Sequence, residues 1–284
     1  MQEYFFVFYR MQQKAEQQAL TVSYTCIGKG NPIVLIHGFG EDHRIWQKQL
    51  PVLQNNHKIL LPDLPGTGAS TLNSATLSID SIAEAIKLML DEEEISTCIM
   101  LGHSMGGYVT LAFAEKYPER LQAFGLIHST AYADTAEKKE ARNKSIAFIR
   151  EHGAFEFVKA TIPNLFAATF NRTHVEEVQL LIEQGKQFTA EALIAYYKAM
   201  MNRPDRTAVL KQTNVPVLLF IGEEDKAVNP ADALAQASIP NTCMVKLIPG
   251  IAHMGMLEAT TALNETITAF IATIHTLTQD SVTA

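Results

Sequence analysis

A serine flanked by glycines stands where a short apolar run gives way to a helical pattern. The residues Gly102-His103-Ser104-Met105-Gly106-Gly107 follow an apolar run over 97–102 and open a helix-like stretch over 105–117. The G-x-S-x-G spacing is typical of a strained strand-to-helix turn, with glycines where a β-carbon would meet neighbouring backbone. Because the first N–H groups of a helix have no partner within it, they can bind a developing oxyanion. The sequence therefore predicts Ser104 as a nucleophile and the Met105 amide as an oxyanion donor.

A second glycine-rich loop, His37-Gly38-Phe39-Gly40, comes directly after the apolar run over 33–36. Its glycines allow a close approach of the backbone, so the Phe39 amide is predicted to be the second oxyanion donor. We interpret His37 as a hydrogen-bonded turn residue. Asp42 and His43 follow it, but the segment has neither His-x-His nor His-Glu-x-x-His spacing, and no metal site is predicted.

Short apolar runs alternate with longer amphipathic stretches along most of the chain. The runs that predict strands lie at 20–26, 33–37, 58–62, 97–102, 123–128, 215–222 and 243–248. The helix-like segments lie near 44–54, 79–93, 105–117, 231–238 and 257–277. Several runs contain almost no polar residue, which is typical of parallel strands covered on both faces. This alternation predicts an open, mostly parallel α/β sheet, whose functional loops lie at the carboxyl ends of the strands.

One stretch, residues 132–203, breaks the alternation. It has no strand-like run, and its helical segments are predicted to be separated at Gly153, Pro163, Asn171 and Thr189. We therefore predict a helical insertion over 132–203, within a sheet domain made of 20–131 and 204–284. Residues 1–19 are predicted to be an N-terminal extension, and Met11 is an alternative start of translation, because it follows an aromatic decapeptide.

Composition excludes several classes of protein. The 284 residues hold 23 Lys and Arg against 30 Asp and Glu, a formal charge of −7. This charge repels phosphate backbones and anionic lipid surfaces, so neither nucleic acid nor membrane is expected as a partner. The run Tyr4–Tyr9 lacks the features of a signal peptide, and a cytoplasmic location is expected. The three cysteines are odd in number and far apart, which indicates neither disulfides nor cysteine-bound zinc.

Three motifs in order resemble the α/β-hydrolase fold superfamily. They are the loop His37-Gly38-Phe39-Gly40, the loop Asp63-Leu64-Pro65-Gly66-Thr67-Gly68-Ala69-Ser70, and the Ser104 elbow. The resemblance covers about residues 20–131 and 204–277. It implies a mostly parallel sheet of about eight strands flanked by helices, with the helical insertion as a cap over the serine. In that family the 63–70 loop is structural, and only this role is expected here.

The family's chain order of serine, acid and histidine implies the partners of the elbow serine. Asp225 stands in the family's G-x-x-D position after the run at 215–222, and His253 is the histidine in the loop after the final run. His253 would act as the base, and Asp225 would orient it. A less common arrangement, with the acid near Ser129 or Asp134, stays open.

The resemblance implies a serine hydrolase that forms an acyl-enzyme on Ser104 and needs neither a metal nor an organic cofactor. A small to medium carboxylic ester, thioester or lactone is the expected small-molecule substrate. Serine at the elbow excludes relatives with aspartate there, namely haloalkane dehalogenases and epoxide hydrolases. A carbon–carbon bond hydrolase, a perhydrolase, or a small-molecule receptor or signalling protein with little turnover remain alternatives.

The cap is expected to form an apolar substrate pocket over the serine. The sequence does not say which of its many apolar side chains face that pocket and which pack it onto the sheet. The candidate substrate-binding residues are His128, Phe166, Tyr197, Met201 and Met254.

Overall fold

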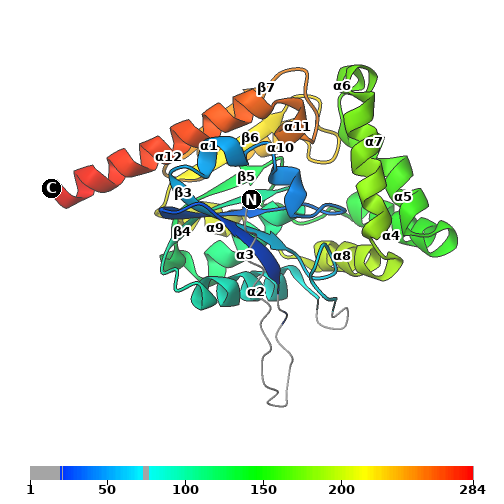
Figure 1. Cartoon of the computed structure of the whole chain (residues 1–284), viewed down its shortest axis with the longest axis horizontal. Helices are drawn as coiled ribbons and strands as arrows, with labels where there is room; N and C mark the ends of the chain where they lie inside the picture. The colour runs from blue at the N-terminus through cyan, green and yellow to red at the C-terminus, as the bar shows by residue number, and fades with distance from the viewer. Residues whose placement is uncertain (1–19, 21, 73–76, 284) are drawn as a thin grey trace, which may run out of the picture.

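Seven strands form one sheet at the centre of the molecule (Figure 1). Their order across the sheet is β1-β3-β2-β4-β5-β6-β7, with β1 antiparallel to β3 and all other neighbours parallel. The seven predicted runs each correspond to a strand, which confirms the mostly parallel α/β sheet, with a number of strands close to the expected eight. The strands are β1 Ser23–Ile27, β2 Asn31–Ile36, β3 His57–Asp63, β4 Cys98–His103, β5 Leu121–Ile127, β6 Val217–Gly222 and β7 Cys243–Ile248.

This computed structural model describes residue 20 and residues 22–72 and 77–283. The predicted extension over 1–19 and the alternative start at Met11 lie outside the described residues. Within those residues, no helix combines the length and the apolar character that crossing a membrane requires.

Helices cover both faces of the sheet (Figure 1). On one face lie α2 (Ile79–Glu92) and α3 (Met105–Lys116), and on the other lie α1 (Leu50–Leu53) and α12 (Thr260–Thr283). Every residue of β4 and β6 is buried, because these strands carry no charged side chain before their last position and are covered from both sides. The other elements of this part are η1 His43–Trp46, η2 Pro118–Arg120, α9 Thr207–Gln212, α10 Pro230–Ala235, η5 Gln236–Ser238 and α11 Gly255–Glu258.

The predicted helix over 44–54 is wrong in detail. The segment forms the short 3-10 helix η1 and then α1, which carries Pro51 in its first turn. Proline has no backbone N–H and clashes with the preceding turn, so it cannot continue a helix from residue 44 but can open a new one.

The chain between β5 and β6 forms a group of helices, which lies beside the carboxyl ends of the strands (Figure 1). Gly153, at φ 88°, separates α4 from α5, and the Thr189 side chain caps α8, as predicted. Pro163 lies in the short 3-10 helix after α5, whereas Asn171 lies inside α6, so the break predicted there is wrong. We refer to residues 136–202 as the inserted helices. They are α4 Ala136–His152, α5 Ala154–Thr161, η3 Ile162–Leu165, α6 Ala168–Thr173, α7 Val175–Gln184, η4 Gly185–Gln187 and α8 Ala190–Asn202.

Candidate active site

Ser104 joins the end of β4 to the start of α3 in a strained conformation. Its φ of 51° and ψ of −115° lie outside the regions that non-glycine residues prefer. A β-carbon on Gly102 would lie 2.2 Å from the Gly106 carbonyl oxygen, and one on Gly106 would lie 2.4 Å from the Ile36 oxygen. The predicted reason for these glycines is therefore confirmed: the turn closes only if both positions lack a side chain.

Asp225 and His253 come together at the ends of β6 and β7. Their Oδ2 and Nδ1 atoms are 2.8 Å apart, and both side chains are buried. The other carboxylate oxygen, Oδ1, accepts the backbone N–H groups of Ala227 and Val228 at 2.8 and 2.9 Å. Burial alone would raise the pKa of Asp225, but the rings of His253 and His128 hold it well below its usual range. Asp225 is thus a carboxylate held in place by two backbone N–H groups, with its other oxygen against the His253 ring.

The elbow and the His253 loop are joined through His103, the residue before Ser104. The His103 Nε2 atom lies 2.9 Å from the His253 carbonyl oxygen. The described hydrogen bonds do not include one between the Ser104 hydroxyl and the His253 ring. In unliganded sites such contacts are commonly long and tighten when substrate binds. The structure therefore brings the loops that carry Ser104, Asp225 and His253 together.

His128 lies against Asp225, outside the lining of the cavity described below. Its Nδ1 is 3.3 Å from Asp225 Oδ2, and the side chain is fully buried. Burial lowers the pKa of His128 to about 4, so the ring is neutral at pH 7. The sequence analysis predicted that His128 contacts the substrate. In the structure its ring lies beside Asp225, as a second imidazole next to that of His253.

The loop with Phe39 lies directly against the elbow. A β-carbon on Gly38 would lie 2.9 Å from His103 Nδ1 and 3.2 Å from the Ser104 β-carbon, so any side chain here would force its neighbours to move. The Gly38 N–H donates to Glu41 Oε2 at 2.7 Å, which fixes the loop just before Phe39. Met105 is the first residue of α3, and its N–H therefore has no partner within the helix. Both candidate oxyanion donors thus belong to segments that meet at Ser104.

Glu41 and His103 form a buried pair that the sequence analysis missed. Glu41 Oε2 lies 2.9 Å from His103 Nδ1, and both residues are at most 4% exposed. Burial opposes charge on each, but their mutual attraction still lowers the pKa of Glu41 and raises that of His103. Since His103 also contacts the His253 carbonyl, the pair links the Phe39 loop, the elbow and the His253 loop. The two residues are 62 positions apart, so no local pattern could have revealed the contact.

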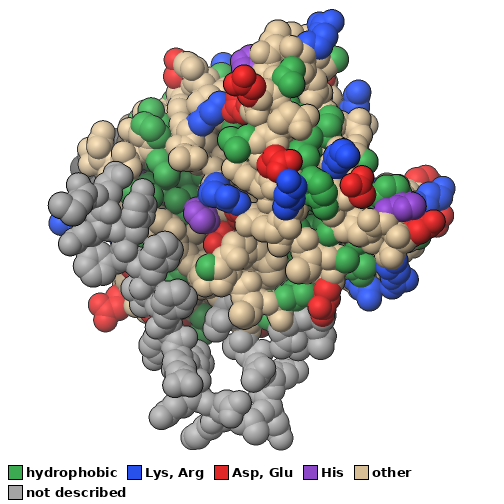
Figure 2. Space-filling model, turned by 45° about the vertical axis from the view of Figure 1, so that its right-hand side comes forward, with side chains coloured by type: hydrophobic (Ala, Val, Ile, Leu, Met, Phe, Trp, Pro, Cys, Tyr) green, Lys and Arg blue, Asp and Glu red, His purple; other side chains and the backbone are tan. Residues whose placement is uncertain are grey.

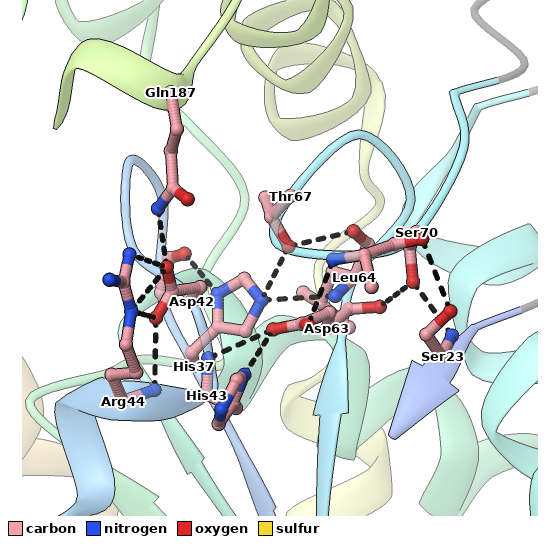
Figure 3. Close-up of polar contacts among 12 residues, drawn as sticks. Ser23, His37, Asp42, His43, Arg44, Asp63, Leu64, Thr67, Ser70 and Gln187 are labelled. Carbon is pink, nitrogen blue, oxygen red and sulfur yellow. Dashed lines mark hydrogen bonds and ion pairs between the residues drawn. The ribbon is translucent and has the colours of Figure 1, made fainter. Parts of the chain in front are cut away.

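The 63–70 loop is built around hydrogen bonds to its own backbone and to the 37–44 segment (Figure 3). His37 Nε2 accepts the Leu64 N–H at 3.0 Å, and His37 Nδ1 lies 2.8 Å from the Gly38 oxygen. Asp63 accepts the Ala69 N–H, and a β-carbon on Gly68 would lie 2.0 Å from its carboxylate. These contacts confirm that His37 is a hydrogen-bonded turn residue.

Asp42, His43 and Asp63 have ligand atoms within 4.8 Å of one another, as a metal site would require. However, His43 Nδ1 is 2.7 Å from Asp63, and Asp42 is paired with the Arg44 guanidinium and with Gln187 of η4 (Figure 3). Although burial opposes it, hydrogen bonds from Arg44 lower the pKa of Asp42 to about 2. A cation already occupies this carboxylate, so we assign no metal to the group. Its visible effect is to tie the inserted helices to the 37–44 segment.

A cavity of about 280 Å³ lies between these loops and the inserted helices. Of the predicted substrate-binding residues, Tyr197 and Met254 line it, whereas Phe166 and Met201 do not. Phe166 is buried and stacks on Phe170 instead. The lining residues, taken from the sheet loops and from the inserted helices, are Phe39, Gly40, Glu41, Lys226, Ala227 and Met254, and Phe157, Val158, Thr161, Ile162, Asn164, Leu165, Leu181 and Tyr197.

Glu258, also missed from sequence, clamps the His253 loop to the inserted helices. Its Oε1 accepts the N–H groups of Ala252 and Met254, at 3.2 and 3.0 Å, and its Oε2 accepts that of Ala167 at 2.8 Å. The His253 N–H itself donates to the Leu165 oxygen at 2.9 Å. One carboxylate therefore holds both neighbours of His253 and fixes them to the helices above.

We expect Glu258→Gln to lower the free energy of unfolding by about 1–3 kcal/mol, because its NH₂ group would face a buried backbone N–H. Urea unfolding measures this change. Glu265→Gln, an exposed change on α12, is the matched control and should stay within about 0.5 kcal/mol of wild type. Equal stability of the Glu258 and Glu265 variants would contradict the clamp.

Comparison with known proteins agrees with this fold. A family model described as alpha/beta hydrolase fold matches residues 31–260. A pimeloyl-[acyl-carrier protein] methyl ester esterase of Legionella pneumophila is 28% identical over 82% of this chain and 92% of its own length. The dihydrolipoyllysine-residue acetyltransferase component of the acetoin cleaving system of Pseudomonas putida is 28% identical over 85% of this chain. The matched region covers 64% of that relative's length.

A solved structure gives the same result in three dimensions. The thermophilic esterase from Thermogutta terrifontis superposes with a TM-score of 0.85 at 26% identity, over 92% of this chain and 100% of that one. The family match covers most of the chain, including the elbow, Asp225 and His253. The chain therefore belongs to the alpha/beta hydrolase fold family.

Proposed function

We propose that this chain is a serine hydrolase that cleaves a small to medium carboxylic ester, thioester or lactone through an acyl-enzyme on Ser104. A serine hydroxyl is a weak nucleophile at neutral pH and needs a base to take its proton. Asp225 accepts a hydrogen bond from His253 Nδ1–H, which leaves Nε2 free of a proton and able to act as that base. No other group is needed for the proton transfers.

In the first half of the reaction, the Ser104 oxygen attacks the carbonyl carbon while its proton passes to His253 Nε2. The Phe39 and Met105 amides bind the oxyanion, and His253 returns the proton to the leaving alcohol. In the second half, water takes the place of serine, and the same histidine activates it. The acid product then leaves, and Ser104 is restored.

The observation that carries this proposal is the hydrogen bond from His253 to Asp225, in a loop that His103 attaches to the strained elbow. The names of the relatives support the ester class: one is a methyl ester esterase and another an esterase. The apolar lining of the cavity suits an acyl chain, and its volume lies near the lower end for small-molecule sites.

The test is turnover of p-nitrophenyl esters of graded chain length, together with labelling by a fluorophosphonate and mass spectrometry of the labelled peptide. Ester turnover with the label on Ser104 is expected. Labelling without turnover of any ester, thioester or lactone would contradict the proposal and would favour a receptor or a carbon–carbon bond hydrolase.

A further inference from the structure

Two lysines beside the cavity have no acidic partner. Lys226, the residue after Asp225, lines the cavity and is exposed. Lys138 of α4 donates from Nζ to the carbonyl oxygen of Ala227, another lining residue, at 2.8 Å. Within the part of the chain that the structure describes, neither lysine forms an ion pair with a carboxylate, although many other lysines do. Lys226 therefore belongs to the wall of a mostly apolar cavity, and the Lys138 ammonium group lies against the backbone of the next lining residue.

Two acids at the cavity, Asp225 and Glu41, are already engaged. Asp225 precedes Lys226, but its oxygens accept two backbone N–H groups and face the rings of His253 and His128. Glu41, the one acidic side chain in the described lining of the cavity, is paired with His103 and the Gly38 N–H. Neither carboxylate can turn toward a lysine without breaking these contacts.

Arg142, another cation near the cavity, already has an acidic partner. Its guanidinium lies 5.5 Å from the centre of the Tyr197 ring and is paired with Asp134. On the face shown in Figure 2, acidic and basic side chains are interspersed, with no broad field of one sign. In a chain of net charge −7, Lys226 is the one basic side chain in the described lining of the cavity. Glu223 and Glu224, which precede Asp225, are exposed and lie outside that lining.

We propose that Lys138 and Lys226 form a subsite for an anionic group on the substrate, so that the preferred substrate is an ester whose acyl chain ends in a carboxylate. This inference rests on the proposed function. Phe39 and Met254, from the loops around Ser104, line the same cavity as Lys226. In this proposal an acyl chain on Ser104 enters the cavity past Phe39 and Met254, and its far carboxylate meets the lysines. Because Lys226 is exposed, salt screens its attraction for such a carboxylate, so added salt is expected to weaken binding.

The subsite binds a part of the substrate that does not react. Its interaction with the far carboxylate is the same in the ground state and in the transition state, so its loss raises KM and leaves kcat little changed. A general loss of structure around Asp225 would lower kcat for every ester instead. This division of the effect between KM and kcat separates anion binding from a merely structural role of Lys226.

The experiment compares p-nitrophenyl hemiesters of succinic, glutaric and adipic acids with neutral esters of equal acyl length. Wild type is expected to prefer the hemiesters in kcat/KM, and 0.5 M NaCl should reduce the preference. Lys226→Gln and Lys138→Gln should each lower the ratio of hemiester to neutral kcat/KM about three- to tenfold, through KM. Lys211→Gln removes the same charge from an exposed site on α9 and should leave the ratio unchanged.

The same variants in the Ser104→Ala background separate the two proposals. Calorimetry there measures hemiester binding whether or not any ester is hydrolysed, and weaker binding after either lysine substitution supports the subsite. Phosphate-ended analogues form a second arm, and tighter binding of these would assign the anion as a phosphate and overturn the carboxylate. Turnover of neutral esters with no hemiester preference in wild type, or a preference that both lysine variants retain, would overturn the subsite and leave the proposed function standing.

Discussion

Alanine in place of Ser104 is expected to lower kcat for ester hydrolysis by about four to six orders of magnitude. The substitution removes the only atom that can form the acyl-enzyme, while the oxyanion donors and the cavity remain. The residual rate should therefore stay above that of the uncatalysed reaction, since oxyanion binding still lowers the barrier. Steady-state kinetics with a p-nitrophenyl ester measure the loss, and the fluorophosphonate label should disappear with it.

The fold should survive this change. The hydroxyl of Ser104 donates no hydrogen bond among the described residues, whereas its backbone N–H and carbonyl are held by Ile127, Gly107 and Ser129. Circular dichroism and melting temperature should therefore match wild type. Ser96→Ala, an exposed change at the opposite end of β4, is the matched control and should keep full activity. Ester turnover by pure Ser104→Ala at the wild-type rate would refute the acyl-enzyme mechanism.

The central strands could be predicted because each is a short apolar run that parallel pairing buries on both faces, whereas the edge strands β1 and β7 are only partly buried. The run at 215–222 became β6, in which every residue is buried, and the run at 243–248 became β7 with the same ends as predicted. Helix boundaries were harder to predict where one residue interrupts a helical pattern, as Pro51 does between η1 and α1. The packing of the inserted helices could not be predicted, because it depends on which of many apolar side chains contact the 37–44 segment.

The residues of the candidate site differ in how far the sequence reveals them. Ser104, Asp225 and His253 each follow a strand, so topology alone brings their loops to one edge of the sheet. Glu41 and Glu258 have no such signal. Glu258 contacts Ala167 across 91 positions. This contact forms only because the inserted helices bring Ala167 next to the His253 loop. Contacts of this kind depend on the folded arrangement and produce no recognisable pattern in the sequence.

Asparagine at position 225 is expected to lower kcat by about four orders of magnitude while the fold is retained. The structure determines how the new amide must lie. Oδ1 of Asp225 accepts the N–H groups of Ala227 and Val228, and only the carbonyl oxygen of asparagine can keep both bonds. The NH₂ group is therefore directed to the place of Oδ2, where it faces His253 Nδ1.

An NH₂ group at that place donates to Nδ1, so the proton of the neutral imidazole moves to Nε2. A protonated Nε2 cannot take the proton of Ser104, and the base is lost although every atom of the ring is present. Because the two backbone hydrogen bonds persist, the melting temperature should change little, and NMR of the ring nitrogens would show the exchanged tautomer. Glu224→Gln, an exposed neighbour, removes the same charge and should keep kcat near wild type. If Asp225→Asn turned over esters as fast as this control, His253 would need another orienting group, and the pairing with Asp225 would be structural only.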